Sequence, residues 1–493
     1  MKKRFISKLF FLALLLLSVG CGSSNNDETQ IVIVSTNDMH AAFESMAKVI
    51  TVVKDLKSKH DNVLVLDAGD HCTGNPYVDM AEPQGEPIHE LMRMAGYSYG
   101  AVGNHEFDYQ QAGFKCGIEA MSLKVLCANA DFEGTVLEDQ IKPYEIFEID
   151  GVRTAILGLI QIDDSGLPSA MPSNMEGIEF VNGVDKSLEY KFLRDSADLV
   201  IGLTHLGFED DSLMVCKNTM FDLVVGGHTH TYLPNGRTIN GTLVTQTGSK
   251  LKGVGVTHIK IKGGEVISIS NEVVSLDGVE PDAEAQAYID SCKSDSPLND
   301  PIGAVGQTLS RVGLANMITD VMRERSGADI VLQNAGSIRI DSLAKGDVTI
   351  GQIYELEPFR NHIVTQKLTL DQIKELVMVK YNSSGGESRS IDLSPSGATY
   401  TIYTNDEGLA TDVEFFDMKG RKMANKSYIM GTNNYVASAY TYSGRGKATP
   451  IEDRVIVADA VIDVIKRDGV YKGDNKIRVT IKKRNKHQIT NFN

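Results

Sequence analysis

Short apolar runs recur through the first half of the chain, and polar residues follow most of them. The runs are nearly continuous rather than alternating, and they lie at 31–35, 62–69, 100–104, 154–160, 198–205 and 222–230. Runs of this kind are typical of strands that are buried on both faces of a sheet. Helical spacing of apolar positions lies between some of them, at 46–59 and 86–96. Residues 31–276 are therefore predicted to form a layered α/β domain in which helices cover the sheets.

The pattern changes at residues 277–300, which are acidic and polar and are predicted to form an interdomain linker with one short helix at 282–292. A second α/β (α+β) domain is predicted over 301–482. Its clearest elements are two amphipathic helices and one buried strand, at 314–327, 369–382 and 328–336. The basic tail, 483–493, is predicted to be a solvated charge run.

The start of the chain has the pattern of an export signal. A basic beginning and an apolar run predict a signal peptide over residues 1–20. The ending "SVGC" resembles a bacterial lipobox, in which Cys21 is lipidated and becomes the new N-terminus. Residues 21–30 would then be a polar tether. We expect an exported protein that is lipid-anchored to the bacterial cell envelope, at its periplasmic face or at the cell surface. Plain secretion is the alternative, and no later segment is long and apolar enough to span a membrane.

The net charge argues against a nucleic-acid partner, and the cysteine spacing argues against one kind of zinc site. The formal net charge is −16, and loss of the four basic residues of the signal peptide takes it to −20. A nucleic-acid polymer is therefore not an expected partner, because its binders usually carry basic surfaces. Five cysteines follow Cys21 at irregular spacings without a CxxC pair, which argues against a thiolate zinc site.

Metal-ligand residue types follow the apolar runs of the first domain. They occur in the segments "STNDMH", "DAGD", "GNHEFD", "LTH" and "GGHTH", and they are Asp38, His40, Asp70, Asn104, His205, His228 and His230. Because strand ends meet at one edge of a layered α/β fold, these side chains can converge. Aspartate, histidine and an asparagine carbonyl suit Zn, Mn, Co or Mg, and the number of candidates exceeds what one tetrahedral ion needs. The sequence therefore predicts two divalent metal ions that share a carboxylate.

The ordered segments resemble the calcineurin-like metallophosphoesterases, and "GNHEFDY" resembles the bacterial 5′-nucleotidase and UDP-sugar hydrolase branch of them. The resemblance implies an N-terminal αββα sandwich and a C-terminal substrate-specificity domain. It also implies that Asp70 bridges the two ions, one of which binds Asp38, His40 and His230, and the other Asn104, His205 and His228. His230 stands where many members of the group have glutamine. His105 and Asp108 would be a catalytic dyad in which the carboxylate fixes the imidazole tautomer.

The second domain also resembles this family. The segments "LQNAGSIR", "SRVGLAN", "EPFRNH" and "GTNNYVASAY" resemble its substrate-binding segments, and the implied contacts are Arg311, Asn334, Arg339, Phe359, Asn361 and Tyr435. Arginine suits a phosphate, and the two aromatic rings would stack on a nucleobase. The chain departs from the family at three positions: Ser337 and Arg360 replace glycines, and Thr441 falls where an aspartate usually binds the ribose.

These observations predict an enzyme that hydrolyses nucleoside 5′-monophosphates to nucleoside and phosphate, with water activated by two metal ions. The substrate would lie between the domains, whose relative motion would admit it. UDP-sugar hydrolysis and 2′,3′-cyclic-nucleotide phosphodiesterase or 3′-nucleotidase activity are alternatives within the family. A nucleotide-binding surface lipoprotein with weak catalysis is the alternative from another class.

Overall fold

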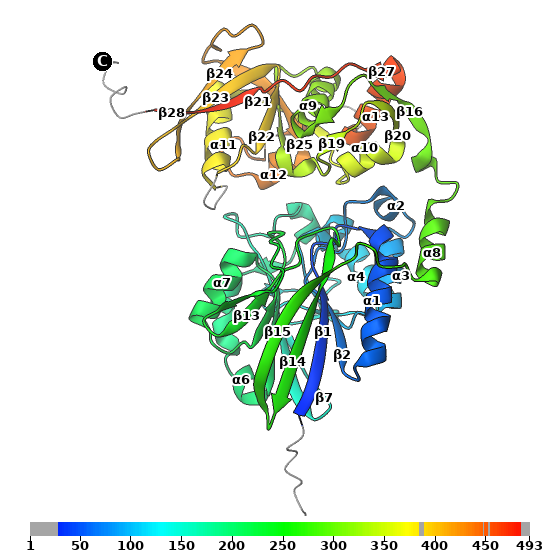
Figure 1. Cartoon of the computed structure of the whole chain (residues 1–493). Helices are drawn as coiled ribbons and strands as arrows, with labels where there is room; N and C mark the ends of the chain where they lie inside the picture. Colours follow the sequence, from blue (N-terminus) through cyan, green and yellow to red (C-terminus); the bar gives the residue numbers. More distant parts are fainter. Residues whose placement is uncertain (1–27, 384–388, 447, 452–453, 485–493) are drawn as a thin grey trace, which may run out of the picture.

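The computed structural model describes residues 28–383, 389–446, 448–451 and 454–484, which form two domains (Figure 1). The predicted signal peptide, Cys21, most of the predicted tether and nearly all of the basic tail lie outside the described residues. None of the described helices is both long enough and apolar enough to cross a membrane.

The first domain contains two large sheets. One has the strand order β15 (Glu265–Ser275), β14 (Gly253–Lys262), β1 (Glu28–Thr36), β2 (Val63–Asp67), β3 (Tyr99–Ala101), β4 (Lys124–Leu126), β6 (Ile141–Lys142). The other has the order β12 (Arg237–Ile239), β13 (Thr242–Thr245), β11 (Leu223–Val225), β10 (Leu199–His205), β8 (Val152–Ile160), β7 (Tyr144–Ile149). β1, β2, β3 and β4 run parallel to one another, as do β8, β10, β11 and β13. The carboxyl ends of each parallel set therefore share one edge.

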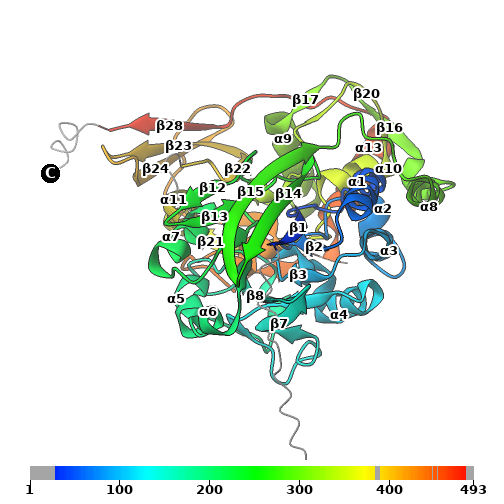
Figure 2. The same ribbon diagram turned by 60° about the horizontal axis from the view of Figure 1, so that its bottom comes forward.

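The two sheets pack face to face with helices outside them. Side chains such as Ile33, Leu66, Ile156 and Leu203 fill the layer between the sheets. The outer face of the first sheet packs on α1 (Met46–Lys59), α3 (Glu86–Ala95) and α4 (Gln110–Met121). The outer face of the second packs on α5 (Gly183–Ser187), α6 (Leu193–Ser196) and α7 (Phe208–Lys217). Figure 2 shows the two groups of helices on opposite sides of the strands, which is the expected αββα sandwich.

The first strand begins earlier than the sequence predicts. β1 starts at Glu28, so residues 28–30 belong to the sheet and not to the tether. Glu28 lies opposite Lys262 of β14 and forms an ion pair of 2.9 Å with Lys260. Antiparallel pairing with a long neighbouring strand therefore extends β1 into polar sequence.

The predicted linker contains a docked helix. α8 (Ala283–Lys293) packs on the first domain, where Ala285 and Ile289 join the core beneath α1 and α3. The 3-10 helix η5 (Pro297–Asn299) follows and packs on α10 (Ile350–Leu356) of the second domain. In Figure 1, α8 lies beside the first domain just before the chain crosses to the second.

The second domain contains several smaller sheets around two apolar clusters. Its largest sheet has the order β22 (Leu393–Ser396), β18 (Ile330–Asn334), β25 (Ser427–Asn433), β21 (Ile363–Thr369), β26 (Thr449–Pro450). Two three-stranded sheets have the orders β20 (Gly346–Thr349), β16 (Pro301–Val305), β27 (Val470–Tyr471) and β24 (Ala410–Asp417), β23 (Ala398–Thr404), β28 (Val479–Lys483). The main helices are α9 (Arg311–Ser326), α11 (Leu370–Ser383), α12 (Asn434–Ala439) and α13 (Val457–Asp468).

Helix α9 differs from its predicted range of 314–327 for local reasons. The Ser310 side chain accepts a hydrogen bond from the Gly313 backbone N–H, which caps the helix three residues earlier. Gly327 ends it in the left-handed conformation, with φ of 64°. Arg311 is therefore the first residue of the helix, directly after its cap.

Candidate active site

The predicted metal ligands of the first domain lie together where its parallel strands end. Asp38 and His40 follow β1, Asp70 follows β2, His205 ends β10, and His228 and His230 follow β11. Several of them adopt the left-handed conformation that residues other than glycine rarely adopt: the φ values are 49° for Asp38, 45° for His40, 59° for Asp70, 76° for His228 and 54° for His230. Such strain gathers at functional sites, because the surrounding structure has to hold it.

One group of ligand atoms comprises Asp38, His40 and His230. Asp38 Oδ1 lies 3.3 Å from His230 Nε2, and the Nε2 atoms of His40 and His230 lie 2.9 Å apart. Asp38 and His40 are buried, whereas the His230 side chain is 40 % exposed. These two Nε2 atoms could both coordinate the same cation through their lone pairs, and neither would then need to donate a hydrogen bond to the other.

A second group comprises Asp70, Asn104, His205 and His228. Asp70 Oδ2 lies 3.1 Å from His205 Nε2, and Asn104 Oδ1 lies 3.1 Å from His228 Nδ1. Asp38 Oδ1 lies 4.0 Å from His205 Nε2, which joins this group to the first. The seven residues therefore form one continuous cluster, with Asp70 and Asp38 at its centre.

The donor chemistry of this cluster fits metal ions. His205 Nδ1 donates to the Ala68 carbonyl at 2.7 Å, so its Nε2 faces the Asp70 and Asp38 carboxylates, where a cation can take the place of a proton. That Nε2 atom is buried and makes no hydrogen bond within the described residues. A buried imidazole nitrogen that points at two carboxylates without a hydrogen bond is suited to coordinate a cation.

Electrostatics at the cluster favour added positive charge. Burial lowers the pKa of His205, but the Asp70 and Asp38 carboxylates outweigh it and raise that pKa well above its ordinary value. Burial, followed by the nearby Arg339 charge, holds the pKa of His40 well below its ordinary value. Burial also lowers the pKa of His228 to about 4. His40 and His228 are therefore neutral at physiological pH, which is the state that binds metal.

His105 and Asp108 form the predicted pair next to this cluster. His105 Nδ1 donates to Asp108 Oδ2 at 2.7 Å, and its Nε2 lies 3.9 Å from Asp70 Oδ2. Burial lowers the pKa of His105, but the Asp70 and Asp108 carboxylates outweigh it and raise the pKa above its ordinary value. The two carboxylates thus favour the protonated ring beside the site, and Asp108 holds its orientation from behind.

Glu106, for which no chemical role is predicted from the sequence, has a buried carboxylate that joins two loops. It accepts hydrogen bonds from the backbone N–H groups of Asp70 at 3.0 Å, His71 at 2.9 Å and Gly103 at 2.7 Å. Glu106 therefore holds the loop of Asp70 against the loop of Asn104. Its place inside "GNHEFD", next to two functional residues, is the one signal in the sequence.

Gly103 allows this close approach. A Cβ atom there would lie 2.4 Å from both Asp70 N and Asp70 Oδ1, and 2.5 Å from Glu106 Oε2.

Asn37 also positions a predicted ligand: its Nδ2 donates to Asp38 Oδ2 at 2.6 Å and to the Gly248 carbonyl at 2.8 Å. The sequence spacing of the motifs predicts neither the close approach at Gly103 nor the positioning of Asp38 by Asn37, because each depends on contacts between loops that are distant in sequence.

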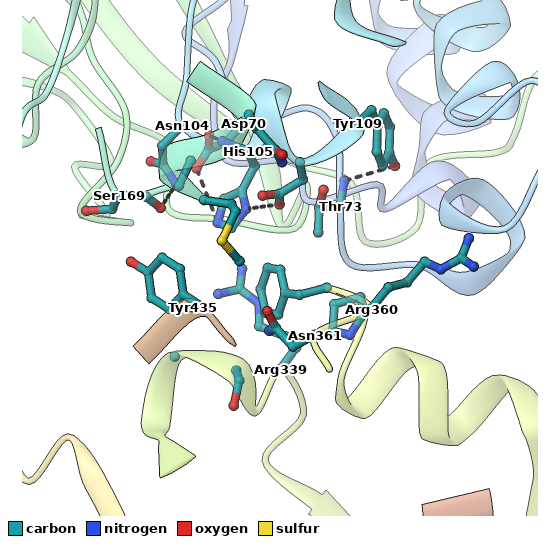
Figure 3. A pocket seen from close by; sticks show the side chains of 18 of the residues that line it. Asp70, Thr73, Asn104, His105, Tyr109, Ser169, Arg339, Arg360, Asn361 and Tyr435 are labelled. Atoms are coloured by element: carbon teal, nitrogen blue, oxygen red, sulfur yellow. Dashed lines mark hydrogen bonds and ion pairs between the residues drawn. The ribbon is translucent and has the colours of Figure 1, made fainter. Parts of the chain in front are cut away.

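A cavity of about 560 Å³ opens beside the cluster, between the two domains. Figure 3 shows Asp70, Asn104 and His105 entering it from the first domain, and Arg339, Asn361 and Tyr435 from the second. The lining also includes Asn334, Phe359 and Arg360 of the second domain and the segment 169–171 of the first. That segment was not predicted; in it, the Ser169 carbonyl accepts from Asn104 Nδ2 at 3.3 Å.

Arg339 reaches from the second domain to the metal cluster. One of its terminal nitrogens lies 3.2 Å from His40 Nδ1, and its guanidinium lies 5.7 Å from the centre of the Phe359 ring. Phe359 in turn stacks on the His105 ring, with centroids 5.7 Å apart and an angle of 24° between the planes. Two predicted substrate contacts therefore touch a predicted ligand and a predicted catalytic residue.

The remaining predicted substrate contacts differ in their positions. Asn334, Asn361 and Tyr435 all line the cavity. Arg311 is exposed, donates to the Ala335 carbonyl at 3.1 Å and pairs with Asp341 at 3.4 Å, and it is not among the lining residues. It supports the loop that follows Asn334, and a direct substrate contact for it stays a prediction.

Two family models match the chain. The calcineurin-like phosphoesterase model matches residues 31–232, and the model of the 5′-nucleotidase C-terminal domain matches residues 301–441. The chain therefore contains a calcineurin-like phosphoesterase domain followed by a 5′-nucleotidase C-terminal domain. These two matches confirm the predicted resemblance and fold class, and a calcineurin-like phosphoesterase domain implies divalent metal ions.

Relatives and solved structures agree with this assignment. The chain is similar to Endonuclease YhcR of Bacillus subtilis strain 168, with 26% identity over 435 residues, which cover 80% of this chain and 34% of that protein. It is also similar to Protein UshA of Yersinia enterocolitica, with 25% identity over 486 residues, 83% of this chain and 85% of that one. The crystal structure of a 5′-nucleotidase precursor from Thermus thermophilus shares the fold, with a TM-score of 0.78, 23% identity and coverage of 92% of this chain and 99% of that one. The chain spans only about a third of the length of the Bacillus protein.

Proposed function

We propose that this protein hydrolyses nucleoside 5′-monophosphates to nucleoside and phosphate at a centre of two divalent metal ions. One observation carries the proposal: four of the seven predicted ligands and the His105–Asp108 pair border the same cavity as Arg339, Phe359 and Tyr435 of the other domain. The four ligands are Asp70, Asn104, His228 and His230. A phosphate at the cluster would thus have aromatic side chains within reach of the rest of the nucleotide.

Each ion would have its own set of ligands, with Asp70 common to both. Asp38, His40 and His230 would complete one set, and Asn104, His205 and His228 the other. Bound ions of this kind lower the pKa of water and stabilise the attacking and leaving oxygens of a phosphoryl displacement. Zn, Mn, Co and Mg all suit these ligands, whose donors are oxygen and imidazole nitrogen.

The chain itself would supply charge and orientation. The His105 imidazolium would donate a hydrogen bond to a phosphoryl oxygen or protonate the leaving oxygen, while Asp108 keeps its ring in place. Arg339 would bind the phosphate through its planar fork of N–H donors. Phe359 and Tyr435 would stack on the base, with Asn334 and Asn361 as polar contacts in the same cavity.

A second candidate is hydrolysis of a UDP-sugar, and Arg360 favours it. Arg360 lines the cavity with a φ of 52°, a conformation that explains why the family usually has glycine there. The described residues give it no hydrogen bond or ion pair, so its charge is available to a second phosphate. Cyclic 2′,3′-nucleotides are a third candidate, because Thr441 stands in place of the usual ribose-binding aspartate.

The deciding experiment measures phosphate release from AMP, UDP-glucose and cyclic AMP isomers, with Mn²⁺ or Zn²⁺ and with a chelator. We expect metal-dependent release from AMP and a loss of about 10²–10⁴-fold in His105→Ala, whose metal content stays unchanged because His105 is not a ligand. His60→Ala is the matched control, since His60 lies beside His258 and away from the cavity. Turnover of UDP-glucose without AMP would support the second candidate. Absence of turnover on all substrates would leave a nucleotide-binding surface lipoprotein.

We also propose that the protein is exported and held at the bacterial cell envelope by a lipid on Cys21, and that this anchor is its only membrane contact. The lipobox-like sequence supports this proposal. Mass spectrometry of the mature N-terminus should find a lipidated cysteine in the wild type. Cys21→Ala should release the protein from the membrane fraction, and an unmodified N-terminus elsewhere in the chain would contradict the proposal.

A further inference from the structure

We propose that His71, Cys72 and His89 bind a third metal ion, a thiophilic d¹⁰ cation such as Zn²⁺ or Cu⁺, at a site separate from the cluster described above. His71 and Cys72 belong to the loop after β2, and His89 belongs to α3. All three are buried, with exposed fractions of 1%, 3% and 4%. The proposal does not depend on the reaction that the enzyme catalyses.

The distances within the trio suit a metal site. The ligand atoms of the three residues all lie within 4.8 Å of one another, and Cys72 Sγ lies 3.7 Å from His89 Nε2. In a tetrahedral zinc site, with bonds of about 2.3 Å to sulfur and about 2.0–2.1 Å to nitrogen, sulfur and nitrogen lie about 3.6 Å apart. The thiol and the imidazole are therefore already spaced as two ligands of one ion.

The hydrogen bonds of His71 leave one nitrogen for the ion. Its Nδ1 faces two buried carboxylates, Asp67 Oδ2 at 3.0 Å and Glu106 Oε1 at 3.2 Å. Its Nε2 is buried and makes no hydrogen bond within the described residues. A histidine that donates from one nitrogen to a carboxylate and presents the other nitrogen is the common arrangement of a metal ligand.

Charge and packing also favour the site. The Asp67 and Glu106 carboxylates both lie at His71 Nδ1. A single imidazole carries at most one positive charge, so a cation bound at its Nε2 would help to balance the two negative charges. Two glycines seat the His89 ring: a Cβ at Gly85 would lie 2.5 Å from its Cε1, and one at Gly117 would lie 2.7 Å from it. The ring is thereby held in one orientation, as a preformed ligand requires.

The trio differs from the neighbouring cluster in its chemistry. The cluster has carboxylate, amide and imidazole donors, whereas the trio contains a thiol, and thiolates select softer ions. An ion bound there would tie the loop that carries Asp70 to α3. It would therefore stabilise the fold next to a predicted bridging ligand without being part of the reaction centre.

Cobalt substitution tests the site, because a thiolate bound to Co²⁺ gives a near-ultraviolet charge-transfer band that oxygen and nitrogen ligands do not give. We expect Co²⁺-loaded wild-type protein to show this band and to hold about three ions per chain. Cys72→Ser and His89→Gln should each lower the content by about one ion, and Cys72→Ser should abolish the band. Cys127→Ser is the matched control, because Cys127 is also 3% exposed and, among the residues that the structure describes, its thiol has a hydrogen bond to the Asn129 side chain and no histidine ligand beside it.

A copper arm separates the two candidate ions. If the site binds Cu⁺, the wild type should bind one equivalent of chelator-buffered Cu⁺ under anaerobic conditions. The Cys72→Ser variant should bind none. A wild-type protein with neither the cobalt band nor this Cu⁺ equivalent overturns the proposal, as does a band that survives in Cys72→Ser. Should the variants not fold, X-ray absorption at the cobalt edge of the wild type decides, since sulfur must appear among its ligands.

Discussion

At the scale of single residues, the charge state of His105 depends on two carboxylates. Asp108 holds Nδ1 at 2.7 Å, while Asp70 lies 3.9 Å from Nε2, and together they raise the pKa of the ring above its ordinary value. A ring that acts as an acid is active below its folded-state pKa and loses activity as the pH rises through that value. If His105 acts as the proposed acid, the two carboxylates would therefore extend activity toward alkaline pH.

Asp108→Asn should move the alkaline fall of activity to lower pH. The amide oxygen can still accept from Nδ1, but it carries no charge, so the pKa of His105 decreases. The measurement is kcat/KM for AMP across the pH range, with Asp164→Asn, an exposed carboxylate of the same domain, as control. An alkaline limb that stays where it is in the wild type would show that another group titrates there.

At the scale of elements, the site is built where loops from neighbouring strands meet. The convergence of the candidate ligands could be predicted because each follows an apolar run, and parallel strands present their ends at a common edge. The hydrogen bonds from Glu106 to the Asp70 loop could not be predicted, because they depend on β2 and β3 being neighbours, which the sequence spacing of the motifs does not reveal. Asn37 illustrates the same limit, since its partner Gly248 is 211 residues away.

Gly103→Ala should destabilise the fold and weaken metal binding. The added methyl group would overlap backbone and carboxylate atoms of Asp70, and overpacking of this kind costs about 1–3 kcal/mol in the free energy of unfolding. Urea unfolding of wild type and variant, with and without metal, measures both effects. Gly306→Ala is the control, because its methyl group would have no neighbour closer than 3.5 Å and should change stability by no more than about 0.5 kcal/mol. Equal stability of the two variants would contradict the proposed crowding.

At the scale of the whole molecule, one domain carries the metal cluster and the other carries the aromatic side chains of the cavity. The sequence predicted this division through segments that resemble the family in both halves. It did not predict that α8 docks on the first domain. The helix buries only Ala285 and Ile289 among its described residues, and the polar residues around them hide this short apolar face in the sequence. Nor did it predict the contact between Arg339 and His40, which depends on how the domains face each other.

Tyr435→Ala tests the division of labour between the domains. Loss of a stacking ring should raise KM for AMP by about 5- to 150-fold, which corresponds to about 1–3 kcal/mol. KM for p-nitrophenyl phosphate, which has no nucleobase, should stay the same within a factor of about two. Tyr403→Ala is the control, since Tyr403 lies on β23 and contacts Glu414 and Arg484 instead of the cavity. An equal loss on both substrates would place Tyr435 in the reaction centre.

The docking of α8 on one domain and of η5 on the other leaves a very short joint. Only residues 294–296 lie between the end of α8 at Lys293 and the start of η5 at Pro297. Three residues span about 10 Å at most, so the second domain cannot move away from the first at this point. Any relative motion of the two domains would therefore be a rotation about this joint, and the side of the cavity farthest from residues 294–296 would move the greatest distance.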